Sequence, residues 1–272
     1  MSDIAPWLAS VSTWIVRRAT DYTPALDSPG RDEGALLEVF DGHVEAVLTE
    51  FSPPGGHRHA DGLIFAHLYA AARDPAADEQ GWRVPSAILV ALLAAETEFR
   101  GPLRSGVRHT ILLAEVYERC GAQLSAVALP GHAALAYRRA AALYRIAEDL
   151  ESEDRCALAL ARARTLTLPA GVRRLGRRVS DMLCGYGYLP FRLLVWLIVE
   201  VAVFGVLVRC AAPGQDVGEW LYTVVTSFLN PTGIGDTDRA PGTRLALAAE
   251  SWAGAVSMSI FFALLVRKWF RL

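Results

Sequence analysis

Through most of its first 170 residues, the chain places apolar residues three or four positions apart, the spacing of one face of an α-helix. This pattern predicts helices over about 6–19, 34–51, 62–74, 84–100, 108–123, 131–150 and 152–166. Turns rich in proline and glycine, such as 53–56, separate them. In the segment 34–51 the apolar face consists of Leu36, Leu37, Phe40, Val44, Val47, Leu48 and Phe51.

Paired helices of this length predict an all-α domain over residues 1–170, built as a helical bundle or as a short solenoid. The small residues of 131–166 do not fall at the positions that a tetratricopeptide repeat requires. The pattern therefore predicts the fold class without a named repeat.

A basic amphipathic helix and a turn are predicted at 171–188. Its apolar face carries Val172, Leu175, Val179, Met182 and Leu183, and its arginines are Arg173, Arg174, Arg177 and Arg178. Such a helix can lie in the membrane interface, with guanidinium groups on lipid phosphates. The alternative is a last soluble helix with its arginines in water. The short turn 185–190 leads directly into an apolar run, which favours the interfacial helix.

Two long apolar runs, 191–208 and 245–266, predict membrane-spanning helices within a module covering 189–272. As a helix the shorter run is about 27 Å long, close to the thickness of a bilayer core. Arginines precede the first run and Arg267, Lys268 and Arg271 follow the second, whereas the segment between the runs has more acidic than basic residues. By the positive-inside rule, we expect an integral membrane protein with both termini in the cytoplasm.

The segment between the spans predicts a re-entrant structure. The apolar stretch 220–229 is long enough for a helix through half of a membrane but too short to cross it. The loop that follows contains Thr232, Gly233, Ile234, Gly235 and Asp236. Glycines at alternate positions permit an extended backbone whose carbonyl groups can face an ion. We therefore predict a pore helix and a filter-like loop at 231–236, in preference to an ordinary extracellular turn.

Residues 185–272 resemble the pore module of two-transmembrane potassium-channel-like proteins. The segment 221–226 resembles the family's pore helix, and 231–236 aligns with its filter, Thr-Val-Gly-Tyr-Gly-Asp. Glu250 and Gly254 resemble positions of the inner helix, where the family often has a hinge glycine. The resemblance implies a homotetramer that conducts a monovalent cation, K⁺ first, with Thr226, Glu250 and Gly254 in pore support or gating.

The filter departs from the family pattern at two positions. Pro231 replaces the threonine whose hydroxyl completes the innermost ion site, and Ile234 replaces the tyrosine that braces the filter. Relative to Thr226, there are also two additional residues before the first filter glycine. These differences leave cation conduction as the expectation and K⁺ selectivity open.

Two carboxylates, Glu200 and Glu250, lie within the predicted spans, where an unpaired charge is costly. We expect Glu250 to brace the pore helix through a hydroxyl such as that of Thr223 or Thr226. For Glu200 three interpretations stay open: contact with a neighbouring subunit, a protonated side chain, or a polar residue that faces another helix.

Composition agrees with a membrane module. Hydrophobic residues make up 53% of the chain, more than in a typical soluble domain, and the excess lies in the C-terminal third. The net charge of −2 gives no basic character that would favour nucleic acid as a partner. The four cysteines show neither the spacing of a metal site nor an obvious disulfide framework.

Catalytic and metal-binding patterns are weak. His57, His59 and His67, with Asp61, are interpreted as part of a polar loop rather than as a metal site, because no recognisable ligand set is complete. The acidic run 148–154 is interpreted as a solvated helix junction. The sequence lacks a glycine-rich phosphate loop, a nucleophile elbow and a Cys/His dyad, so we expect neither an enzyme nor a bound cofactor.

Together these patterns predict a cation channel in the lipid bilayer. One hairpin cannot enclose a pore, so conduction requires several copies of the chain. The helical domain would gate the pore, or receive a cytoplasmic signal or partner protein, through the amphipathic helix. Two alternatives remain: a membrane-anchored signalling or interaction protein, and an effector that depolarises the membrane.

Overall fold

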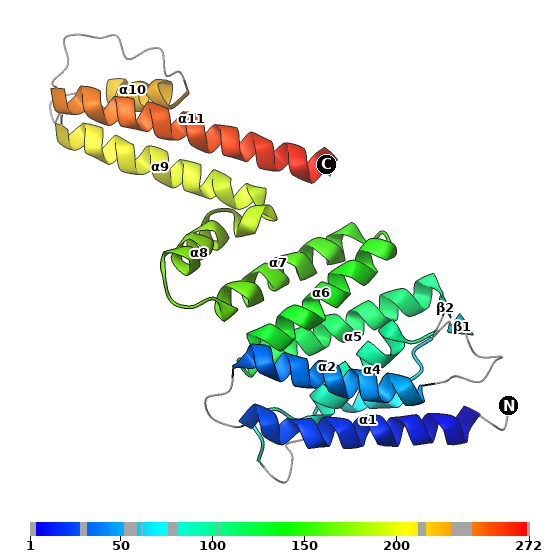
Figure 1. Ribbon diagram of the computed structural model, residues 1–272. Helices are drawn as coiled ribbons and strands as arrows, with labels where there is room; N and C mark the ends of the chain where they lie inside the picture. The colour runs from blue at the N-terminus through cyan, green and yellow to red at the C-terminus, as the bar shows by residue number, and fades with distance from the viewer. Residues whose placement is uncertain are drawn as a thin grey trace. The chain divides into compact units, whose positions relative to one another are not determined.

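The computed structural model describes residues 4–27, 32–51, 59–60, 62–75, 81–102, 104–211, 216–229 and 241–270. Over these ranges the chain is helical except for turns and one pair of two-residue parallel strands, β1 (His59–Ala60) and β2 (Arg104–Ser105). This confirms the all-α class. The chain forms two compact units, residues 1–174 and 175–272 (Figure 1).

Every helix predicted in the first unit is present. Its helices are α1 (Ile4–Asp27), α2 (Glu33–Glu50), α3 (Ala66–Ala71), α4 (Ser86–Arg100), α5 (Val107–Ala126), α6 (Pro130–Ile146) and α7 (Leu150–Thr167). The first is longer than predicted and continues through Pro24, whereas α3 is shorter than the predicted 62–74. Consecutive helices α5, α6 and α7 pack side by side as antiparallel hairpins (Figure 1).

The core of this unit surrounds α4. Residues 88–98 of α4 are all buried, so the helix is covered on every side, and α1, α2 and α5 pack against it. A helix that is apolar all round is expected at the centre of a domain. Glu96 and Glu98 are exceptions in this apolar stretch, and both are buried.

The turn between α5 and α6 and the turn between α6 and α7 share one backbone motif. Ala128 and Glu148 both have φ of 59°, a left-handed conformation usually taken by glycine. In each turn the next amide donates to a carbonyl five residues earlier: Leu129 to Leu124, and Asp149 to Tyr144, both at 3.0 Å. The motif ends α6 at Ile146, four residues before the predicted end at 150.

The second unit contains the end of α8 (Val172–Cys184) and a single 3-10 turn, Gly185–Gly187. It continues with α9 (Pro190–Ala211), α10 (Val217–Leu229) and α11 (Pro241–Phe270). The predicted spans 191–208 and 245–266 lie inside α9 and α11, and the predicted pore helix 220–229 lies inside α10.

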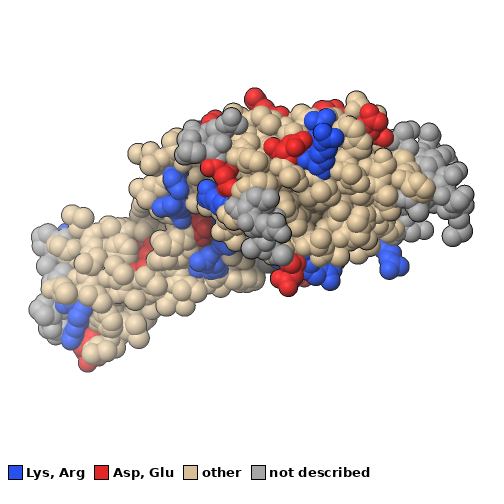
Figure 2. Space-filling view, turned by 90° about the horizontal axis from the view of Figure 1, so that it is seen from below, with Lys and Arg blue, Asp and Glu red and all other residues tan. Residues whose placement is uncertain are grey.

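Two helices, over Pro190–Cys210 and Gly242–Arg267, are long and apolar enough to cross a membrane. Only 22% of each apolar window is buried within the structure. A core helix of a soluble protein would be mostly buried, so this exposed apolar surface is consistent with membrane insertion. Ile198, for example, is 70% exposed. In Figure 2 the hairpin, at the left, shows mostly uncharged surface.

Candidate functional site

The candidate site is the hairpin of α9 and α11 together with the short helix α10, which packs against both (Figure 1). A small apolar cluster of Val208, Val224 and Leu247, one residue from each helix, holds the three together. The hydroxyl of Ser227 donates to the carbonyl of Leu247 at 3.2 Å, which ties the last turn of α10 to α11.

Gly205 fits α9 against α10. The indole Nε1 of Trp220 donates to the carbonyl oxygen of Gly205 at 2.8 Å. A Cβ atom at Gly205 would lie 3.1 Å from the Trp220 ring, closer than most side-chain contacts. The glycine therefore leaves space for the tryptophan. Neither residue was predicted from the sequence to form this contact. The available signal was Gly205 itself, because a glycine inside a long apolar helix is a sign of close helix packing.

Gly254 has the same role on α11. A Cβ atom there would lie 2.7 Å from the Phe228 ring and 3.2 Å from the Phe228 carbonyl oxygen. The backbone of α11 is helical on both sides of Gly254. The structure thus places this residue at the contact with α10, and the expected role in gating stays a prediction.

Glu250 lies on the same face of α11 as Leu247 and Gly254, since the three are three and four residues apart. Its side chain is fully buried, and neither carboxylate oxygen has a hydrogen-bond partner among the described residues. The hydroxyls of Thr243 and Ser251, also on α11, are likewise buried without a hydrogen-bond partner among the described residues. We call Thr243, Glu250 and Ser251 the polar seam of α11.

Bracing of Glu250 by Thr226 is not observed. The Thr226 hydroxyl donates instead to the carbonyls of Tyr222, at 2.7 Å, and Thr223, at 3.2 Å. Threonine inside a helix commonly bonds to the preceding turn in this way, because its hydroxyl is short and close to those carbonyls. The support of α10 by Glu250, through Thr226 or Thr223, stays a prediction.

Glu200 faces α11. One of its oxygens accepts a hydrogen bond from Ser257 at 3.0 Å, and the other is buried without a partner among the described residues. The pair lies beside a pocket of about 320 Å³ that Leu183, Trp196 and Ile260 help to line. This contact agrees with the interpretation of Glu200 as a polar residue that faces another helix.

The predicted filter residues Thr232, Gly233, Ile234, Gly235 and Asp236 lie outside the described residues, as does Pro231. The structure therefore describes the two helices that flank this loop, α10 and α11, and not the loop itself.

The predicted amphipathic helix corresponds to α8, and none of its residues is buried. Val172 is 88% exposed and Leu175 is 63% exposed, with Val179 and Met182 also exposed. Among the predicted interface arginines Arg173, Arg174, Arg177 and Arg178, the guanidinium of Arg177 lies 5.7 Å from the centre of the Tyr186 ring. An exposed apolar stripe beside a set of arginines is the arrangement of an interfacial helix.

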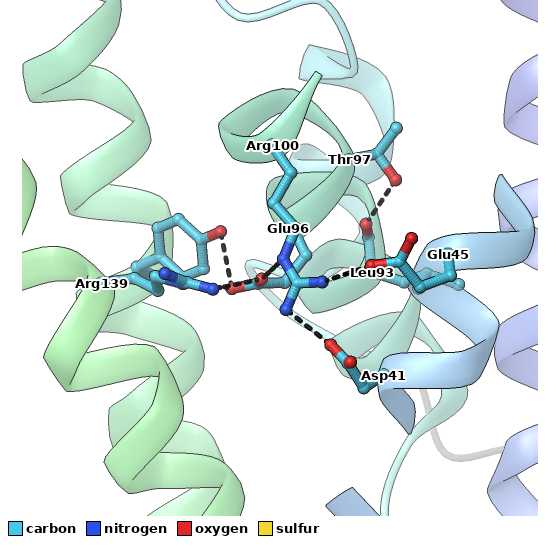
Figure 3. A network of polar contacts seen from close by, with 8 residues as sticks. Asp41, Glu45, Leu93, Glu96, Thr97, Arg100 and Arg139 are labelled. Atoms are coloured by element: carbon cyan, nitrogen blue, oxygen red, sulfur yellow. Dashed lines mark hydrogen bonds and ion pairs between the residues drawn. The ribbon is translucent and has the colours of Figure 1, made fainter. Parts of the chain in front are cut away.

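The first unit contains a buried ion network centred on Glu96 of α4 (Figure 3). Its carboxylate accepts two bonds from Arg139 of α6, at 2.9 and 3.0 Å, and one each from Arg100 and Tyr117, both at 3.0 Å. Arg100 continues outward to Asp41 at 2.5 Å and Glu45 at 3.1 Å on α2. The network joins α2, α4, α5 and α6.

Two further carboxylates, the buried Glu98 and the partly buried Glu33, join distant elements. Glu98 accepts from the Phe65 amide at 2.8 Å and lies 3.1 Å from His109 Nε2. Glu33 accepts from the amides of Gly131 and His132, at 2.8 and 2.9 Å, at the start of α6. Hydrogen bonds from His132 and Gly131 offset the effect of burial and lower the pKa of Glu33. These contacts hold the first unit together.

Two residues of the predicted histidine loop, His57 and Asp61, lie outside the described residues. Within the described ranges, no group of three or more His, Cys, Asp and Glu residues is arranged to hold a metal ion. Comparison of the chain with protein-family models, with curated proteins and with solved structures finds no match.

Proposed function

We propose that the chain is one subunit of a membrane cation channel, a homotetramer, in which α11 lines the pore and residues 231–236 form the filter. The helical unit would act as the cytoplasmic regulatory domain, connected through α8. The observation that carries this proposal is the position of α10: a 13-residue helix, too short to cross a bilayer, packed against two helices that are long enough to do so.

The packing of α10 supports the proposal because it is specific. Two glycines, Gly205 and Gly254, each leave space for one aromatic residue of α10. A loop that merely connected two membrane anchors would need neither contact. A half-membrane helix also places the segment that follows it at membrane depth, where irregular backbone is tolerated if protein or water satisfies it. Here that segment is the predicted filter.

The polar seam is consistent with a membrane helix that packs inside a bundle. Buried carboxylates and hydroxyls in a membrane helix generally face a bundle interior or an aqueous cavity, because lipid cannot satisfy them. The carboxylate of Glu250 has no partner within the described part of one chain. Glu250 is fully buried on the face of α11 that packs against α10, so in each subunit it would lie between α11 and the pore helix, inside the bundle.

Recording currents from purified protein in planar bilayers tests the proposal. We expect a conductance whose reversal potential follows the cation gradient, and Gly233→Asp should abolish it because a side chain would enter the filter. Gly242→Ala is the matched control, since a Cβ atom there meets nothing within 4 Å. An anion-selective current, or a current that Gly233→Asp leaves unchanged, would contradict the proposal.

The subunit count is tested by native mass spectrometry in mild detergent. We expect a mass four times that of the 29.5 kDa chain. A monomer without conductance would favour the membrane-anchored signalling protein, in which the hairpin only tethers the helical unit.

Cysteine labelling tests the orientation. Cys210 is exposed at the end of α9, whereas Cys120 and Cys156 are buried in the helical unit. Burial raises the pKa of each of these two thiols to about 12, so they are unreactive in the folded protein. The fourth cysteine, Cys184, is partly exposed and is replaced by serine for this test. A membrane-impermeant maleimide should then label intact cells at Cys210, and Cys210→Ser should remove the label. Labelling only after cell lysis would place this end of α9 in the cytoplasm and reverse the predicted topology.

A further inference from the structure

A cavity of about 420 Å³ lies in the helical unit between α2, α4, α6 and α7. This is within the size range of sites that bind small organic molecules. Apolar side chains from two helices, Leu37 and Phe40 of α2 and Leu135 of α6, form part of its wall. Three arginines also line it: Arg100, Arg138 and Arg164.

The three arginines differ in what they bind. The charge of Arg100 is compensated, because it contacts the carboxylates of Asp41, Glu45 and Glu96. By contrast, no hydrogen bond or ion pair joins the side chain of Arg138 or Arg164 to another described residue. Arg138 is the neighbour of Arg139, which turns inward to Glu96, so adjacent residues of α6 serve the core and the cavity.

The charge of the cavity wall is positive. Its acidic residues are Asp41, which is bonded to Arg100, and the exposed Glu38. The wall therefore carries two guanidinium groups and one carboxylate that no described group of opposite charge compensates. A guanidinium group binds phosphate or carboxylate with paired, charge-assisted hydrogen bonds. A phosphate monoester carries nearly two negative charges at neutral pH, which matches two arginines better than the single charge of a carboxylate does.

We propose that this cavity binds a small phosphate monoester with a flat apolar body. The phosphate would lie between Arg138 of α6 and Arg164 of α7, and the body would pack against Leu37 and Leu135. Because the two arginines belong to different helices, the bound ligand would join α6 to α7, the last helix before α8. This inference concerns the helical unit and does not depend on whether the hairpin conducts ions.

Isothermal titration calorimetry, in which phenyl phosphate is added to the full-length protein in detergent, tests the proposal. Loss of one charged hydrogen-bonding partner should weaken binding about tenfold or more, so we expect this of Arg138→Gln and of Arg164→Gln. Arg108→Gln replaces an exposed arginine in the first turn of α5 and is the matched control, which should bind like the wild type. Because Arg138 and Arg164 are exposed, their replacement should leave the thermal melting curve unchanged, which separates lost binding from lost folding.

Two further comparisons define the ligand class. Glu38→Gln should tighten binding of phenyl phosphate, because it removes a like charge, and weaker binding would contradict an anionic ligand. Inorganic phosphate should bind more weakly than phenyl phosphate, since it lacks the apolar body. Equal affinity for the two probes would overturn the proposed class, and no binding of phenyl phosphate, or unchanged binding by the two arginine variants, would overturn the site.

Discussion

Two buried glutamates, one in each unit, have opposite surroundings. Glu96 in the helical unit and Glu250 in the hairpin are both fully buried. Glu96 accepts hydrogen bonds from Arg100, Tyr117 and Arg139, whereas Glu250 has no partner among the described residues. An ionised carboxylate without partners is very costly inside a protein. The helical unit satisfies its buried charge internally, and the hairpin does not.

The apolar surfaces of the two units differ in the same sense. The helical unit encloses its large apolar side chains around α4, where Leu89 and Leu92 are 0% exposed. On the hairpin, Ile198 and Trp252 are 70% and 72% exposed. The helical unit therefore has an apolar core of its own. The hairpin has apolar groups outside, and inside it has polar groups without a partner among the described residues, which is the arrangement expected where lipid surrounds a polar interior.

The largest effect is expected from Glu96→Ala. It would leave the guanidinium of Arg139 partly buried without its carboxylate, and breaking a buried ion pair costs about 3–5 kcal/mol. The loss should appear as a lower melting temperature by circular dichroism. Glu45→Ala is the control, because its carboxylate is 65% exposed and such pairs contribute about 1 kcal/mol or less. Equal losses in the two variants would show that Glu96 is not the centre of the network.

A smaller effect is expected from Gly254→Ala. The added methyl group would overlap the Phe228 ring, and overpacking of this kind costs about 1–3 kcal/mol. Thermal melting should show the loss, with Gly242→Ala as the unaffected control. The double variant Gly254→Ala/Phe228→Leu should recover part of the stability, because the smaller side chain removes the overlap with the ring but not the close approach to the carbonyl oxygen of residue 228. An equal loss in the double variant would mean that α10 does not pack at Gly254.

A still smaller effect is expected from acid. Arg155 donates to Glu118 at 2.6 and 3.0 Å and lowers the pKa of that carboxyl. The unfolded carboxyl, with a pKa of about 4.3, then binds a proton before the folded one does as the pH falls. The stabilisation is fully present above the pKa of the unfolded carboxyl and is lost as the pH falls through the lower pKa of the folded one. We expect the melting temperature of the wild type to fall more steeply than that of Glu118→Gln between about pH 5 and pH 3. Parallel curves would contradict this role of Glu118.

The smallest effect is expected from Glu250→Gln. The amide removes a buried charge without breaking a hydrogen bond to a described residue, so the melting temperature should stay the same or rise. Removing the carboxylate should nevertheless change the single-channel conductance if Glu250 supports the pore helix α10. A clear fall in melting temperature would show that Glu250 has a partner outside the described ranges.

Local patterns predicted the helices because each pattern repeats within one turn or two. The spacing in 34–51 predicted α2, and the apolar runs predicted the cores of α9 and α11. The end of α6 was missed because its left-handed position is occupied by Glu148 and not by glycine, so the usual signal was absent. The bond considered between Thr226 and Glu250 is not present in the structure, because the Thr226 hydroxyl donates to the helix backbone.

The sequence by itself determined the helical class, two helices of membrane length, and the amphipathic character of α8, since these depend on periodicity and composition along the chain. Only the tertiary structure decided which polar groups meet. Glu96 and Arg139 are 43 residues apart, and Gly205 and Trp220 are 15 apart. The structure also brought Arg138 and Arg164 to one cavity while Arg139 turned to the core. Such pairings depend on how helices pack, which no local spacing encodes.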